Sequence, residues 1–126
     1  MEIRKYIPSD FEKLIRIIEQ EGDAWDYWKP AHRDVYQVAL EKSITYVAID
    51  KDELCGFSRS IDDLARQMIV CDLLVTRAHR GKGIGRQLLS CILTDFPEKE
   101  VYAMSDVDEY YLKQAYAKVG SVIRIL

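Results

Sequence analysis

Half of the glycines in this chain fall within five consecutive residues, and this cluster limits what can fold around it. The 126-residue sequence has six glycines, and Gly81, Gly83 and Gly85 form the cluster. Residues 68–75, just before it, form an apolar run typical of a buried strand. Residues 84–93, which overlap its end, repeat apolar side chains at helical spacing. The cluster therefore predicts a turn from a core strand into an amphipathic helix.

The residues around this turn are suited to binding an anion. The first turn of a helix leaves its backbone N–H groups unpaired and carries a partial positive charge. Glycines let an oxygen-bearing ligand approach those groups closely. No acidic residue stands between Asp72 and Asp95, and the basic residues in that interval are Arg77, Arg80, Lys82 and Arg86. The segment predicts an anion site, and the alternative is a surface turn with solvated charges.

Composition excludes several classes of protein. Eighteen basic against 21 acidic residues give a net charge of −3, so bulk charge predicts no nucleic-acid partner. No apolar run approaches the ~20 residues of a membrane span, and we expect no membrane partner. Cys55, Cys71 and Cys91 form no closely spaced pair, and His32 and His79 have no ligand near them in sequence, so we expect no metal. Together with an N-terminus that lacks a signal-peptide block, these features predict a cytoplasmic protein.

The order of predicted elements indicates one mixed α/β domain over residues 1–126. A first helix should begin at Ser9, with Glu12 completing a capping box. The predicted order is β-α-α-β-β-β-α-β-α-β. The ranges are a strand over 3–6, helices over 9–21 and 31–41, strands over 44–49, 54–61 and 68–75, a helix over 84–93, a strand over 101–104, a helix over 106–114 and a closing strand over 119–126.

The glycine cluster resembles the coenzyme A motif of one enzyme superfamily. Arg80-Gly81-Lys82-Gly83-Ile84-Gly85 fits R-x-x-G-x-G, the acetyl-CoA motif of the GNAT N-acetyltransferases. The element order and the hairpin before the motif are similar too. The resemblance implies a mostly antiparallel twisted sheet of about six strands, flanked by four helices. It also implies that amides of Arg80, Gly81, Lys82, Gly83, Ile84, Gly85 and Arg86 bind the pyrophosphate of acetyl-CoA, while pantetheine lies along Leu74 and Val75.

The same resemblance implies a reaction and a catalytic tyrosine. The expected activity is transfer of an acetyl group from acetyl-CoA to a primary amine, of a small molecule or a protein, by direct attack with both substrates bound. Family members often carry a tyrosine before a Lys-x-Gly-aromatic segment. Tyr111 fits with Ala115 in place of the glycine and leaves room for a closing strand, whereas Tyr116 fits with Gly120. We choose Tyr111, with Tyr116 and simple core packing as alternatives.

The acceptor side is less defined. Asp72 is the candidate general base, but it could equally pair with Arg59 across the sheet. Acids and aromatic residues are interleaved near the end of the first helix and suit either a cationic amine or a solvated helix end: Glu19, Glu21, Asp23, Trp25, Asp26, Tyr27 and Trp28. The competing function is a non-catalytic acyl-CoA-binding module on the same fold, and a homodimer is compatible with both.

Overall fold

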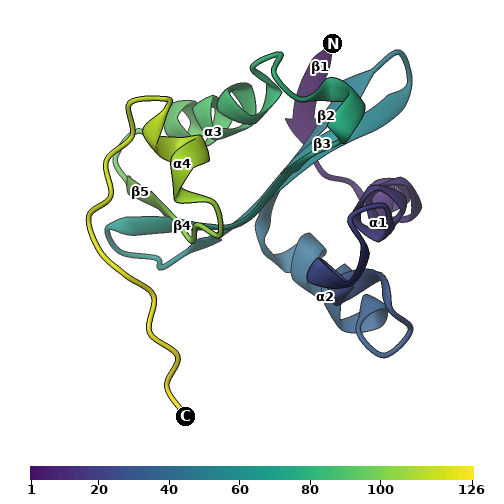
Figure 1. Ribbon diagram of the computed structural model, residues 1–126, viewed down its shortest axis with the longest axis horizontal. Coiled ribbons are helices and arrows are strands. Elements are labelled where there is room, and N and C mark those ends of the chain that lie inside the picture. Colours follow the sequence, from purple (N-terminus) through teal and green to yellow (C-terminus); the bar gives the residue numbers. More distant parts are fainter.

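A five-stranded sheet runs through the molecule in chain order, β1-β2-β3-β4-β5 (Figure 1). The computed structural model describes residues 1–126. All neighbouring strands are antiparallel except β4 and β5, which are parallel. The strands span Glu2–Lys5 (β1), Ile44–Asp50 (β2), Glu53–Asp62 (β3), Gln67–Val75 (β4) and Glu100–Ala103 (β5).

Four α-helices cover the two faces of the sheet (Figure 1). Helices α1 (Phe11–Glu19) and α2 (Arg33–Lys42) pack with one buried cluster that includes Phe57 of β3. Helix α3 (Ile84–Asp95) packs with a second cluster on the other face, and α4 (Asp108–Leu112) lies against it. No helix combines the length and the apolar character that crossing a membrane requires. The mixed α/β class predicted from the sequence is confirmed.

A bulge in β4 changes which side chains of this strand point to the α1-side core and which point to the α3-side core. Arg59 pairs with Asp72 and Ser60 pairs with Val70, so Cys71 has no partner on β3. An extra residue reverses the in-and-out alternation of side chains. Val70 therefore joins the α3-side core, whereas Leu74 joins the α1-side core. Because both faces of β4 are covered, the strand reads as an almost continuous apolar run.

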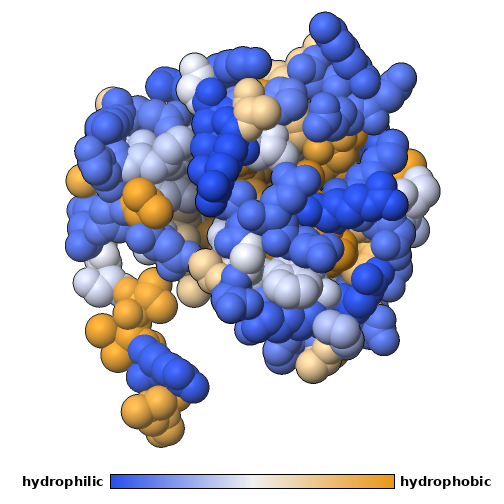
Figure 2. Space-filling model, turned by 45° about the vertical axis from the view of Figure 1, so that its right-hand side comes forward, coloured by the Kyte–Doolittle hydropathy of each residue, from blue (hydrophilic) through white to orange (hydrophobic).

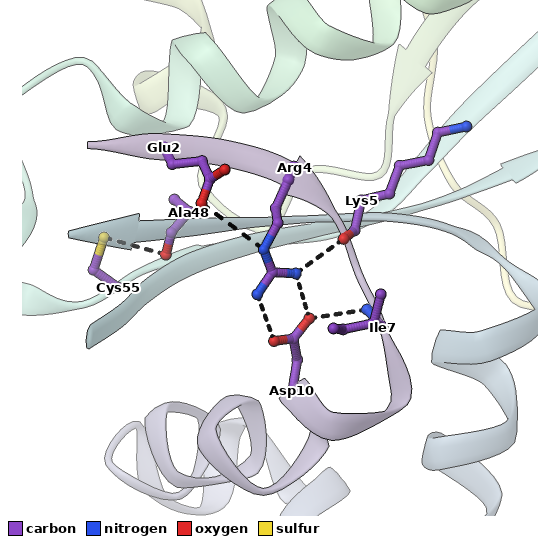
Figure 3. Close-up of polar contacts among 7 residues, drawn as sticks. All are labelled: Glu2, Arg4, Lys5, Ile7, Asp10, Ala48 and Cys55. Atoms are coloured by element: carbon purple, nitrogen blue, oxygen red, sulfur yellow. Dashed lines mark hydrogen bonds and ion pairs between the residues drawn. The ribbon is translucent and has the colours of Figure 1, made fainter. Parts of the chain in front are cut away.

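The start of α1 is held differently from the sequence prediction (Figure 3). Arg4 of β1 donates from Nη1 and Nη2 to the two carboxylate oxygens of Asp10, both at 2.8 Å, and the Ile7 N–H donates to Asp10 at 2.9 Å. No side-chain cap by Ser9 forms. A paired carboxylate makes stronger hydrogen bonds than a hydroxyl, so the predicted Ser9 cap is wrong.

The predicted sixth strand is absent. No strand follows Ala103 of β5, and residues 117–126 run as an extended, exposed tail away from the sheet (Figure 1). Branched apolar side chains in this segment favour a strand, but a strand also needs an edge to pair with. The expectation of about six strands is corrected to five, with the fold class unchanged.

Candidate functional site

Two glycines shape the loop that joins β4 to α3. Gly81 has φ +78° and Gly83 has φ +81°, in the left-handed region that side chains disfavour. A Cβ at either position would meet nothing within 4 Å. These glycines are therefore required by the backbone conformation, and the space beside them is open to a ligand.

The start of α3 leaves its backbone donors free. Gly83 precedes the helix and caps it with no side chain, and the first turn holds no acidic residue. Because the first amides of a helix have no intrahelical acceptor, the N–H groups of Ile84, Gly85 and Arg86 are available. The helix dipole adds positive potential at this end. The start of α3 thus has the free donors that an anion site needs, and the anion site itself stays a prediction.

The basic residues of the loop divide into two kinds. Arg77, Lys82 and Arg86 are exposed and form no ion pair. Arg80 instead donates from Nε to the Val75 carbonyl at 2.9 Å and from Nη2 to the Glu21 carboxylate at 2.9 Å. Its side chain ties the loop to the end of β4 and to the segment after α1. Three free cations therefore surround the glycine loop.

The second half of β4 offers an open backbone edge beside this loop. β4 pairs with β5 only over Gln67–Val70, and the Met104 N–H donates to the Val70 carbonyl at 2.9 Å. Residues 72–75 pair with β3 alone, and Cys71 pairs with neither neighbour. Leu74 and Val75, both predicted to contact the ligand, lie on this open stretch. An extended chain of amide groups could lie along it and end at the start of α3.

A tyrosine that sequence reasoning missed reaches the first turn of α3. A Cβ at Gly85 would clash with the hydroxyl of Tyr110, so that hydroxyl occupies the space the glycine leaves. Tyr110 is adjacent to Tyr111 in α4, and their rings meet edge-on at 5.1 Å. Spacing alone cannot distinguish which of two adjacent tyrosines faces α3. The available signal was Gly85, because a glycine inside a helix often marks close packing.

The two predicted tyrosines share one cluster. Tyr111 and Tyr116 pack against the α3-side core with ring centroids 6.5 Å apart, and burial raises the pKa of Tyr111 to about 12. Ala115 has φ +66°, whereas Gly120 has no positive φ. Ala115 therefore adopts the conformation that a glycine favours, which supports the register in which it replaces the motif's glycine.

Asp72 is engaged in a buried ionic network. Its Oδ2 accepts from Arg59 Nε at 2.6 Å and from the Tyr36 hydroxyl at 2.9 Å. The ring of Tyr27 stacks on Tyr36 at 4.0 Å. Burial and the Asp72 charge both raise the pKa of Tyr36. Of the two roles predicted for Asp72, the structure shows the pairing with Arg59.

The acidic residues after α1 do not converge on a shared site. Glu21 pairs with Arg80, Asp23 with Lys29 at 3.1 Å and Asp26 with His32 at 3.8 Å. The two tryptophans of the same segment make structural contacts within the chain. Trp25 packs edge-on to Phe57, and Trp28 Nε1 donates to the Gly22 carbonyl at 3.0 Å. These contacts fit the solvated helix end better than a cation site.

Solved structures with the same fold span nearly the whole chain. A GNAT-family acetyltransferase from Streptococcus pneumoniae is 22% identical, with TM-score 0.78, covering 99% of this chain and 97% of its own. A ribosomal-protein-alanine N-acetyltransferase from Brucella melitensis biovar Abortus 2308 is 20% identical, with TM-score 0.76, covering 99% of this chain and 100% of its own. At these identities the likeness establishes the fold alone.

Sequence comparison identifies the family. No curated protein matches the chain. The model of the acetyltransferase (GNAT) domain matches residues 41–120, which include the glycine loop, α3, β5 and α4. The match covers more than half of the chain. This chain therefore belongs to the GNAT acetyltransferase family.

Proposed function

We propose that this protein transfers the acetyl group of acetyl-CoA to a primary amine, of a small molecule or a protein, in a ternary complex. One observation carries the proposal. The free amides of Ile84, Gly85 and Arg86 lie next to the unpaired stretch of β4, with three unpaired cations beside them. Backbone donors and cations suit a pyrophosphate, and the strand edge suits the amide-bearing arm of coenzyme A.

The residues of the chain would position the substrates and assist charge transfer. The amine nitrogen attacks the thioester carbonyl carbon, the carbon–sulfur bond breaks, and the proton lost by the amine ends on the thiolate. A backbone N–H of Leu74 or Val75 would stabilise the developing oxyanion. Tyr111 is the proposed donor to the sulfur. A pKa of about 12 makes it a hydrogen-bond donor rather than a full acid.

Calorimetry with acetyl-CoA tests the binding half of the proposal. Gly83→Asp and Gly83→Asn are a matched pair, since both side chains tolerate a left-handed φ and only aspartate adds a charge. We expect Gly83→Asp to abolish binding, Gly83→Asn to retain part of it, and both to unfold at the same temperature. Equal affinities in the two variants would remove the anion site from the proposal.

Release of free coenzyme A across an amine panel tests the catalytic half. The competing acyl-CoA-binding module gains support from Asp72, which is paired with Arg59 and leaves no evident base. Acetyl-CoA binding without amine-dependent release would favour that module. Phenylalanine variants identify the hydroxyl that turnover requires, provided that their affinity for acetyl-CoA is unchanged. The variants replace Tyr110, Tyr111 and Tyr116. We expect the largest loss for Tyr111→Phe.

A further inference from the structure

The ion pair on the α1 side of the sheet leaves several hydrogen-bond donors unused. Arg59 of β3 lies opposite Asp72 of β4, and its Nε donates to Asp72 Oδ2 at 2.6 Å. Its Nη1 donates to the Ser43 hydroxyl at 3.3 Å. A guanidinium has five N–H donors, so most of them, including both on Nη2, remain without a partner. The Arg59 side chain is 14% exposed and Nη2 is not sealed from solvent. A ligand can therefore reach a cation whose position the fold fixes.

A second unused donor lies in the same cluster. The ring of Tyr27 stacks on the ring of Tyr36 with centroids 4.0 Å apart, and the Arg59 guanidinium lies 5.6 Å from the Tyr36 centroid. The Tyr27 hydroxyl forms no hydrogen bond, and it stays protonated because burial and the Asp72 charge raise the pKa of Tyr27. Arg59 and Tyr27 thus present free donors that suit a group with acceptors alone.

This cluster lies beside the stretch of β4 where we place the acetyl group. Asp72 and Leu74 are two residues apart on one strand, so their side chains share a face and are about 7 Å apart. Leu74 and Tyr36 belong to the same α1-side core. The N–H of Leu74 or Val75 is the proposed donor to the oxyanion. A group bound by Arg59 is therefore one short molecule away from the reacting carbonyl.

We infer that the acceptor is an α-amino acid whose carboxylate is bound by Arg59 and Tyr27. This inference rests on the proposed acetyl transfer. A carboxylate matches the planar guanidinium and accepts at about 3 Å. The attacking nitrogen stands about 3 Å from the carbonyl carbon. In an α-amino acid the nitrogen and the carboxyl carbon are about 2.5 Å apart, so the molecule spans the distance between the two positions.

Other classes of acceptor fit these surroundings less well. A phosphate carries more charge than a carboxylate and costs more to bury beside the compensating charge of Asp72. A polycationic amine needs free carboxylates, but Glu21, Asp23 and Asp26 are already paired. Figure 2 shows the side of the molecule that carries α1 and α2 as mostly hydrophilic, which suits a polar acceptor better than a lipid-like one.

Matched sets of amines test the inference through release of free coenzyme A. Each set holds an amino acid, its amide and its decarboxylated amine, such as phenylalanine, phenylalaninamide and phenethylamine, and further sets start from alanine and glutamate. The amide also stands for the N-terminus of a protein. We expect kcat/KM for an amino acid to exceed that of both partners by about tenfold or more. Amine-dependent release with equal kcat/KM inside every set would overturn this inference alone, whereas no release with any amine would refute the proposed function as well.

Variants assign the preference to the cluster. Arg59→Lys keeps the charge but loses the planar fork, so kcat/KM should fall about tenfold for the amino acid and change less than about twofold for the decarboxylated amine. Arg33→Lys is the matched control, because Arg33 also pairs with a carboxylate, that of Glu12 at 2.7 Å, and lies 5.3 Å from the ring centroid of Phe11. This variant should keep the wild-type preference.

Tyr27→Phe gives an independent result if Arg59→Lys fails to fold. It removes a hydroxyl that has no partner in the fold, so its unfolding temperature should match the wild type. We expect kcat/KM to fall several-fold for the amino acid and to stay the same for the decarboxylated amine. An unchanged preference in Tyr27→Phe, or in a folded Arg59→Lys, would overturn the assignment of the carboxylate to this cluster.

Discussion

Replacing Asp72 with asparagine distinguishes a structural carboxylate from a catalytic base. The side chains of Asp72 and Arg59 are 7% and 14% exposed, and their N–O distance is 2.6 Å. Breaking a buried pair from one side costs about 3–5 kcal/mol, because the remaining charge stays buried. Asparagine keeps an acceptor for Arg59 or Tyr36, which lowers the cost. We therefore expect Asp72→Asn to lose about 2–3 kcal/mol of unfolding free energy.

Urea unfolding measures this loss, and three further variants assign it: Tyr36→Phe, Arg59→Met, and Arg59→Met combined with Asp72→Asn. Tyr36→Phe removes only a neutral donor and should cost about 1 kcal/mol. Arg59→Met combined with Asp72→Asn leaves no buried charge, so the double variant should lose less than the sum of its parts by 1 kcal/mol or more. This non-additivity is the signature of a direct charge pair.

Turnover at saturating acetyl-CoA completes the test. A structural Asp72 predicts that the asparagine variant, at a temperature where it is folded, keeps the pH dependence of the wild type. Unfolding free energy within about 0.5 kcal/mol of wild type, together with loss of the acidic limb of the pH–rate profile, would refute the structural role. That result would restore Asp72 as the general base.

Other contacts in the fold give further predictions. Arg4 lowers the pKa of Asp10, so the pair stabilises the protein above the ordinary carboxyl pKa of about 4 and loses this contribution as the pH falls through the folded-state pKa. In the Asp10→Asn variant, the urea midpoint of unfolding should change less between pH 2 and about 6 than it does in the wild type. Midpoints that change with pH in parallel in the two proteins would contradict this. Ser58 and Ser60 are fully buried with unpartnered hydroxyls, so alanine at either should raise stability by about 1 kcal/mol in thermal unfolding. A comparable loss would indicate a hidden hydrogen bond. Arg80→Ala should cost under about 1 kcal/mol, since Arg80 is 48% exposed, yet should weaken acetyl-CoA binding several-fold by freeing the loop. Unchanged affinity in calorimetry would argue against that.

Features set by local sequence were predictable. The apolar faces of α1 and α3, the β2–β3 hairpin and the glycine loop each depend on a short run of residues. Gly81 and Gly83 adopt the positive φ that makes a glycine-rich turn recognisable. The proposed anion site depends on the same segment, because a helix start and its neighbouring cations need no distant partner.

Features set by distant partners were not predictable. The sequence predicts Ser9 as a helix cap, whereas in the structure the guanidinium of Arg4 of β1 binds the carboxylate of Asp10 at the start of the helix. The tail after Tyr116 has the composition of a strand, but composition does not supply the sheet edge that a strand needs. The Ser9 cap is decided by a group on another element, and the tail forms no strand because it pairs with no edge.

The two halves of the proposed reaction differ in the same way. The proposed recognition of acetyl-CoA uses amides and cations within one loop, so its candidate residues can be named from the sequence. Acceptor chemistry relies on side chains brought together by strand register, as when Arg59 faces Asp72 only because Cys71 bulges out of β4. A one-residue change in register would turn the Asp72 carboxylate to the other face of the sheet. The acceptor is therefore better sought by testing amines against the folded protein than by extending the motif search.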